Sequence, residues 1–145
     1  MSDAPTSALR ARCEDEVTDL HRFFGGWLRG EIAPDSGGLS RMSDVLAEGF
    51  HMISAAGEIL GRSEIVTAVR SAHGTKPAGF AIRTEDCRFR LGSRRLGVVT
   101  YQEWHDEGGE SRGRLSTAIF QDRADAPNGV EWVHVHETWI GRAGS

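Results

Sequence analysis

The pattern of apolar and polar residues changes once along the chain, from a helical period in the first half to a period of two in the second. From Ala8 to about Arg29, apolar side chains recur every three or four residues and no proline interrupts them. The stripe consists of Val17, Leu20, His21, Phe24, Trp27 and Leu28. This spacing predicts one long amphipathic helix whose aromatic end faces the core.

Two shorter helices and a strand are predicted in the rest of the first half. A loop at residues 34–38 precedes a second helix, and residues 50–54 are typical of a strand. The apolar positions of the second helix are Leu39, Met42, Val45 and Leu46. We expect Ser63 to cap a third helix, from Glu64 to about His73, which Gly74 would terminate.

Four strand-like runs with short turns between them fill the second half. They are Phe80–Leu91, Leu96–His105, Gly113–Gln121 and Val130–Ile140. Short connections make consecutive strands antiparallel neighbours. Helices in the first half and a meander in the second predict an α+β fold, with the helices on one face of a curved antiparallel sheet. Residues 8–145 are expected to form one domain after a disordered lead at residues 1–7.

The last strand has a distinctive alternation of residue types. Side chains in a strand point to opposite faces in turn. Strict alternation places Trp132, His134 and His136 on one face and Glu137 among apolar residues on the other. A charged group is rarely buried without a partner or a purpose, so the function depends on whether Glu137 lines a pocket.

Composition limits the possible partners. The 145 residues are 39% hydrophobic and 26% charged, with a formal net charge of −4. Acids are interleaved with the arginines, so no clustered basic face for nucleic acid is predicted. No apolar run is long enough to span a bilayer, and the start lacks the apolar core of a signal peptide. Cys13 and Cys87 stand alone, which favours neither disulfides nor zinc. We therefore expect a cytoplasmic protein without nucleic-acid or membrane partners.

The order of these elements resembles that of the nuclear transport factor 2-like superfamily. The resemblance rests on the long first helix, the 50–54 strand with the glycines after it, the capped third helix, the meander and the final strand opening with Trp132. Residues 99–104 and 132–139 are most similar to the SnoaL-like and kinase-association-domain branch of bacterial proteins. The resemblance implies a cone-shaped, cystatin-like α+β roll, with three helices packed on the concave face of the sheet.

The resemblance also implies which side chains face a pocket inside the cone. Matching the final strand to the kinase association domain turns Val135, Glu137 and Trp139 inward. It turns His134, His136 and Thr138 outward, where they would form the interface of a homodimer. On the two preceding strands the inward residues would be Tyr101, Glu103, His105, Arg114, Ser116, Ala118 and Phe120. A register shift of one residue would exchange the two faces.

The inward carboxylates are the candidate chemistry. A carboxylate in an apolar pocket has a raised pKa and can move a proton near neutral pH, so Glu137 and Glu103 are candidate catalytic residues, with Tyr101 as a hydrogen-bond donor. The alternative is that Glu137 pairs with an arginine such as Arg114 and only stabilises the fold. The candidate ligand-binding residues are Tyr101, Glu103, Arg114, Phe120, Glu137, Trp139, Trp27 and His21.

Neither a metal nor a cofactor is expected. His134 and His136 have the spacing of a metal pair, but no further His or acid follows to complete a ligand set. The first hypothesis is therefore a pocket protein that binds a small, partly apolar organic ligand. The alternatives are a cofactor-free isomerase, dehydratase or cyclase that uses a pocket glutamate, and a homodimeric association module without activity.

Overall fold

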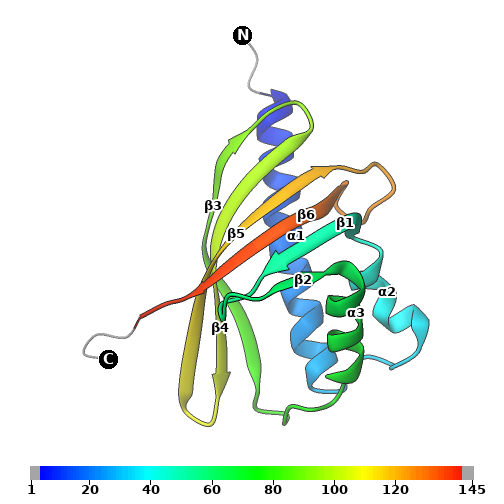
Figure 1. The fold of residues 1–145 in the computed structure, drawn as a ribbon, viewed down its shortest axis with the longest axis vertical. Coiled ribbons are helices and arrows are strands. Elements are labelled where there is room, and N and C mark those ends of the chain that lie inside the picture. The colour runs from blue at the N-terminus through cyan, green and yellow to red at the C-terminus, as the bar shows by residue number, and fades with distance from the viewer. Residues whose placement is uncertain (1–3, 142–145) are drawn as a thin grey trace.

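The computed structural model describes residues 4–141, which form three helices and one curved six-stranded sheet (Figure 1). The helices are α1 (Ala4–Leu28), α2 (Ser36–Ser43) and α3 (Arg62–Ser71). The strands are β1 (Leu46–Ile53), β2 (Ile59–Gly61), β3 (Ala81–Gly92), β4 (Leu96–Glu107), β5 (Glu110–Asp122) and β6 (Val130–Trp139). All three helices lie on one side of the sheet, and the predicted α+β fold class is confirmed. Within the described residues, no helix combines the length and the apolar character needed to cross a membrane.

The strands follow the order β2-β1-β6-β5-β4-β3, and the predicted meander runs from β3 to β6. The sheet is antiparallel except where β1 pairs with β6 in parallel, with Met52 opposite Val135. A parallel pair needs a long crossover connection, and here the whole of α3 and the meander separate the two strands in sequence. The prediction of an entirely antiparallel sheet is therefore corrected at this one pair.

Helix ends differ from the sequence prediction in three places. Helix α1 begins at Ala4, so residues 4–7 of the expected lead are helical, and residues 1–3 lie outside the described residues. Helix α2 ends at Ser43, because the chain enters β1 and the carbonyl of Val45 accepts a hydrogen bond from the backbone of β6.

The N-cap of α3 was also predicted two residues too late. The N-cap is Gly61, not Ser63, and the carboxylate of Glu64 accepts a hydrogen bond from the Gly61 amide at 2.9 Å. This hydrogen bond, from the backbone amide of the cap residue to an acid at the third helical position, takes the place of a cap by a side-chain hydroxyl. Strand β2, only three residues long, was not predicted.

A β-bulge in β6 decides which of its side chains face the helices. Phe120 pairs with Trp132 and the preceding Ile119 pairs with His134, so Val133 is the extra residue. An extra residue interrupts the alternation of faces. Trp132 is therefore buried on the same side as Val135 and Glu137, and strict alternation, which placed Trp132 with His134 and His136, was wrong at this point.

The core forms where the apolar stripe of α1 packs on the concave face of the sheet. Its buried members include Leu9, Cys13, Val17, Leu20 and Trp27 from the helix and Val99, Phe120 and Trp132 from the strands. Removal of this apolar surface from water is the main stabilising contribution.

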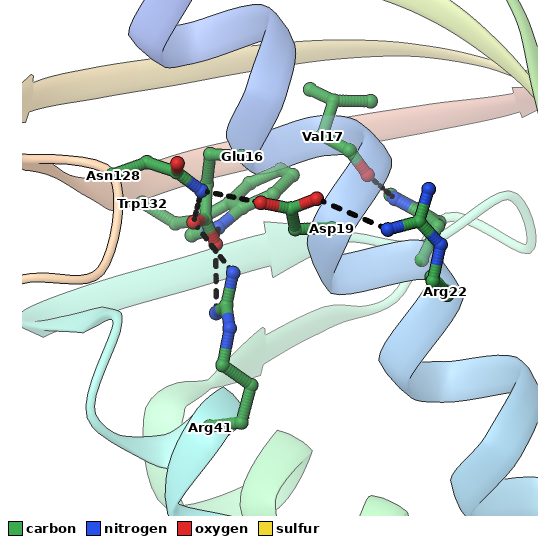
Figure 2. Close-up of polar contacts among 8 residues, drawn as sticks. Glu16, Val17, Asp19, Arg22, Arg41, Asn128 and Trp132 are labelled. Carbon is green, nitrogen blue, oxygen red and sulfur yellow. Dashed lines mark hydrogen bonds and ion pairs between the residues drawn. The ribbon is translucent and has the colours of Figure 1, made fainter.

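One fully buried carboxylate, Glu16, lies on that stripe and joins α1 to three other segments (Figure 2). Two guanidinium nitrogens of Arg41 in α2 donate to it at 2.8 and 3.2 Å. The indole Nε1 of Trp132 donates at 2.9 Å, and the amide of Asn128, before β6, donates at 3.0 Å. Four donors satisfy both carboxylate oxygens, which is what a buried charge requires.

Candidate functional site

A cavity of about 250 Å³ lies between the helices and the concave face of the sheet. Most of its wall is apolar and comes from all three helices and from β1, with Phe24, Phe50, Met52 and Val69 among its members. The polar lining residues are His21 from α1 and Tyr101, Glu103, His105, Arg114 and Glu137 from β4, β5 and β6. The polar groups are therefore concentrated on the sheet side of an otherwise apolar space.

The sheet register explains why these side chains meet. Tyr101, Glu103 and His105 face inward because they alternate along β4. In β5, Arg114 lies opposite Glu103, and Ser116 lies opposite both Tyr101 of β4 and Glu137 of β6. Directly opposed residues bring their side chains within contact distance.

Glu103 is held by two histidines. Its Oε1 accepts a hydrogen bond from Nε2 of His21 at 3.0 Å, and its Oε2 accepts one from Nε2 of His105 at 2.6 Å. Burial would raise the pKa of Glu103, but the charge of His21 and the hydrogen bonds from both rings outweigh it. They hold the pKa of Glu103 well below its usual range, so this carboxylate is ionised.

His21 carries a positive charge in this arrangement. Its Nδ1 lies 2.7 Å from the carbonyl oxygen of Val17, which can only accept a hydrogen bond, and its Nε2 faces the ionised Glu103. Both ring nitrogens must therefore donate, and a ring with two donors is an imidazolium. Burial lowers the pKa of His21, but the charge of Glu103 and the two hydrogen bonds outweigh it and raise that pKa.

Glu137 both pairs with an arginine and faces the cavity. Its Oε1 accepts a hydrogen bond from Arg114 Nη1 at 3.2 Å, whereas its Oε2 has no hydrogen-bond partner among the described residues. Burial, followed by the charge of Glu103, raises the pKa of Glu137, and Arg114 only partly offsets this. The ion pair considered as an alternative is present, and it leaves one carboxylate oxygen available to a ligand.

Tyr101 and Ser116 complete the polar row across the sheet. Burial, with the charges of Glu103 and Glu137, raises the pKa of Tyr101 well above its usual value, so the phenol remains a neutral hydrogen-bond donor. The hydroxyl oxygen of Ser116 is fully buried opposite Tyr101, and as a hydrogen-bonding neighbour of the phenol it offsets part of the rise in the Tyr101 pKa.

Five of the eight predicted ligand-binding residues line this cavity: Tyr101, Glu103, Arg114, Glu137 and His21. Phe120 does not, because it packs behind Trp132 with ring centroids 4.4 Å apart. Trp27 does not, because its indole turns toward α3 and donates to the carbonyl of Val69 at 2.6 Å.

Trp139 also lies outside the cavity, although it was predicted to face it. It is the last residue of β6 and 43% exposed. Its ring lies against the guanidinium carbons of Arg112 and Arg114, at 4.6 and 5.2 Å from the ring centroid. The strand end extends to a second, outer hollow, which Trp139 lines instead.

His105 was expected to face inward but was not among the predicted site residues. Its place in the alternation after Tyr101 and Glu103 was the available signal. Its ring lies edge-on to Phe80 at 5.6 Å and reaches both the cavity and the outer hollow.

The residues predicted to form a dimer interface lie on the opposite face of the sheet. His136 and Thr138 are exposed, and His134 is half-buried beside His51, with ring centroids 4.8 Å apart. Burial and the neighbouring histidines lower the pKa of His134. Among the described residues, no three His, Cys, Asp or Glu side chains are grouped closely enough to hold a metal ion. The homodimer itself stays a prediction.

Similarity to solved structures confirms the fold that the resemblance implied. A nuclear transport factor 2-like protein of unknown function from Pseudomonas aeruginosa superposes with a TM-score of 0.80 at 23% identity, covering 90% of this chain and 99% of that one. A hexachlorocyclohexane dehydrochlorinase has a TM-score of 0.64 at 12% identity, covering 97% and 90% of the two chains. A kinase hub from S. rosetta has a TM-score of 0.60 at 13% identity, covering 92% and 95%. At such identities the likeness concerns the fold alone.

Sequence similarity narrows the relationship further. Sucrose-phosphatase 2 of Nicotiana tabacum is 28% identical over 131 residues, which are 88% of this chain but only 31% of the tobacco protein. The chain thus spans about a third of the length of the curated relatives it matches. The sequence pattern of the sucrose-6-phosphate phosphohydrolase C-terminal family matches residues 13–141, so the chain belongs to that family.

Proposed function

We propose that this domain binds a small, partly apolar organic molecule in the cavity between the helices and the sheet. The observation that carries the proposal is the contrast between the apolar walls and the polar groups of Tyr101, Arg114 and Glu137 on one side. Small-molecule sites typically combine an apolar lining with a few convergent polar groups that fix the orientation of the ligand.

The size of the cavity limits the ligand. An apolar cavity of roughly 150 Å³ accommodates benzene, so one of about 250 Å³ suits a molecule slightly larger than a single aromatic ring. The walls offer few hydrogen-bond partners for the many hydroxyls of a sugar. We therefore infer that the domain binds a ligand other than a sugar.

The proposal predicts that filling the cavity weakens binding of a neutral probe, 4-phenylbutan-1-ol. Ala72 lines the cavity at the end of α3 and is half-buried, so Ala72→Phe would place a ring in the space. We expect this variant to bind the probe at least about tenfold more weakly in a calorimetric titration, which corresponds to a loss of about 1.4 kcal/mol.

Ala78→Phe is the matched control, because Ala78 is exposed in the loop before β3 and does not line the cavity. It should bind the probe as the wild type does. A wild-type protein that does not bind the probe, or equal binding by the Ala72→Phe variant, would argue against the cavity as a ligand site.

A second candidate function is proton transfer by His105, supported by its contact with Glu103. Because Nε2 of His105 donates to Glu103, its Nδ1 is the ring nitrogen that can accept a proton. A histidine oriented by a carboxylate is a common general base. Glu103, ionised and with both oxygens engaged by histidines, would position His105 rather than move a proton itself. Tyr101 would stabilise an enolate.

This candidate predicts exchange of α-protons in an apolar ketone. Wild-type protein in D₂O is expected to accelerate the loss of the α-proton signals of phenylacetone, followed by proton NMR. His105→Gln should slow that exchange by about 10²-fold or more, the usual contribution of a general base. His51→Gln, an exposed histidine of the outer face, is the control. No acceleration by the wild type would contradict the proposal for this class of substrate.

A further inference from the structure

A second hollow adjoins the cavity and is lined by residues of the β4–β5 hairpin, the loop before β3, the end of α1 and the end of β6. The β4–β5 turn, the loop before β3 and the end of α1 lie at the same end of the molecule (Figure 1). This outer groove has a volume of about 670 Å³. Leu28, His105 and Arg114 line both the outer groove and the inner cavity. The two spaces are therefore adjacent and share these three side chains in their walls.

The outer groove differs from the inner cavity in its charge. Three cationic side chains line it, Lys76, Arg112 and Arg114, against two carboxylates, Glu107 and Glu110. Lys76 neutralises Glu107 at 3.0 Å. Within the described residues Arg112 makes no ion pair, and Arg114 uses only Nη1 for Glu137. Guanidinium donors thus remain available on the two neighbouring arginines.

Aromatic rings hold these cations in place. Arg112 and Arg114 both lie against Trp139, and Lys76 lies over Phe80 with its nitrogen 5.2 Å from the ring centroid. Cation–π contacts limit the freedom of long side chains that would otherwise move in solvent. Because the donors are already positioned, less conformational entropy is lost when an anion binds.

We infer that the molecule bound by this domain is an amphipathic carboxylate, with its apolar body in the inner cavity and its carboxylate in the outer groove against Arg112 and Arg114. The inference rests on the proposed binding function and adds the chemical class of the ligand and a second subsite. A guanidinium group can donate two parallel hydrogen bonds to the two oxygens of one carboxylate. The opposite orientation is disfavoured, because His21 and Arg114 are already paired with Glu103 and Glu137 in the inner cavity, whereas Arg112 in the outer groove has no ion pair within the described residues.

Three probes with one body and different heads test the inference: 4-phenylbutyrate, 4-phenylbutan-1-ol and 4-phenylbutylamine. In calorimetric titrations at low ionic strength, the carboxylate is expected to bind about tenfold more tightly than the alcohol, as charge-assisted hydrogen bonds predict. The amine should bind most weakly. The preference for the carboxylate should shrink as salt is added, because the groove is open to solvent.

Substitutions of arginine test where the carboxylate of the ligand lies. Arg112→Gln is expected to reduce the preference for the carboxylate over the alcohol about tenfold. Arg88→Gln, which removes an exposed arginine of β3 outside both hollows, should leave the preference unchanged. A preference that survives Arg112→Gln would overturn the placement of the head and with it the inference.

The three probes also distinguish the proposed binding function from the inference that the ligand is an amphipathic carboxylate. If the alcohol binds and the carboxylate binds no more tightly, the amphipathic-anion inference is overturned while the cavity remains a binding site. If none of the three probes binds, the proposed function fails and the inference fails with it.

Discussion

Replacement of Glu16 by alanine is expected to lower the free energy of unfolding by about 3–5 kcal/mol, the cost of breaking a buried ion pair by removing one partner. The carboxylate is fully buried and accepts hydrogen bonds from Arg41, Asn128 and Trp132 (Figure 2). Without it, the Trp132 indole N–H loses its buried acceptor and the Arg41 guanidinium its counter-charge. Urea denaturation followed by tryptophan fluorescence measures the loss.

Asp15→Ala is the matched control, because Asp15 is the adjacent acid of α1 and is exposed. Its effect should stay within about 0.5 kcal/mol. Asp19→Ala is a further comparison and not a neutral control, since Asp19 accepts a hydrogen bond at 3.0 Å from the same Asn128 amide that donates to Glu16. A Glu16→Ala variant as stable as Asp15→Ala would mean that the donors around Glu16 find other acceptors at little cost.

Glu16 also illustrates where the sequence was informative and where it was not. Periodicity predicted α1 and its buried stripe, since Val17, Leu20 and Trp27 repeat at helical spacing and are buried. The same spacing put Glu16 near that stripe, but nothing local indicates that a charge there has partners. Its donors come from α2, from the segment before β6 and from β6 itself, and only the folded chain brings them together.

The polar residues of the cavity were also predicted only in part, because some of their contacts join segments that are far apart in the sequence. The match to the kinase association domain implied the correct faces for Tyr101, Glu103 and Arg114, because neither β4 nor β5 has a bulge over that stretch. In β6 the bulge at Val133 made the face predicted for Trp132 by strict alternation wrong. The contact between His21 and Glu103 joins residues 82 positions apart, and local spacing rules do not predict contacts over such a separation.

Replacement of Glu103 by glutamine is expected to lower the free energy of unfolding by about 3 kcal/mol near pH 5.5, because it leaves the buried His21 imidazolium without a counter-charge. His21 and Glu103 are only 5% and 8% exposed in their side chains, so solvent screens the pair weakly. Urea denaturation of the wild type and the Glu103→Gln variant, repeated across pH, gives the stability difference as a curve. Glu107→Gln, a carboxylate of the same strand whose side chain is 46% exposed, is the control and should show a small difference at every pH.

The shape of that curve follows from the directions of the two pKa shifts. The folded pKa of Glu103 is lowered from its ordinary value of 4.5, so the stability it contributes is complete above pH 4.5 and is lost as the pH falls toward the lowered pKa. The folded pKa of His21 is raised from 6.5, so its contribution is complete below pH 6.5 and is lost as the pH rises through the raised pKa. The difference between wild type and variant should therefore be largest between pH 4.5 and pH 6.5 and decline on both sides. A difference that stays constant from acid to alkaline pH would show that the pair is not ionised, and would return Glu103 to the set of possible proton carriers in the cavity.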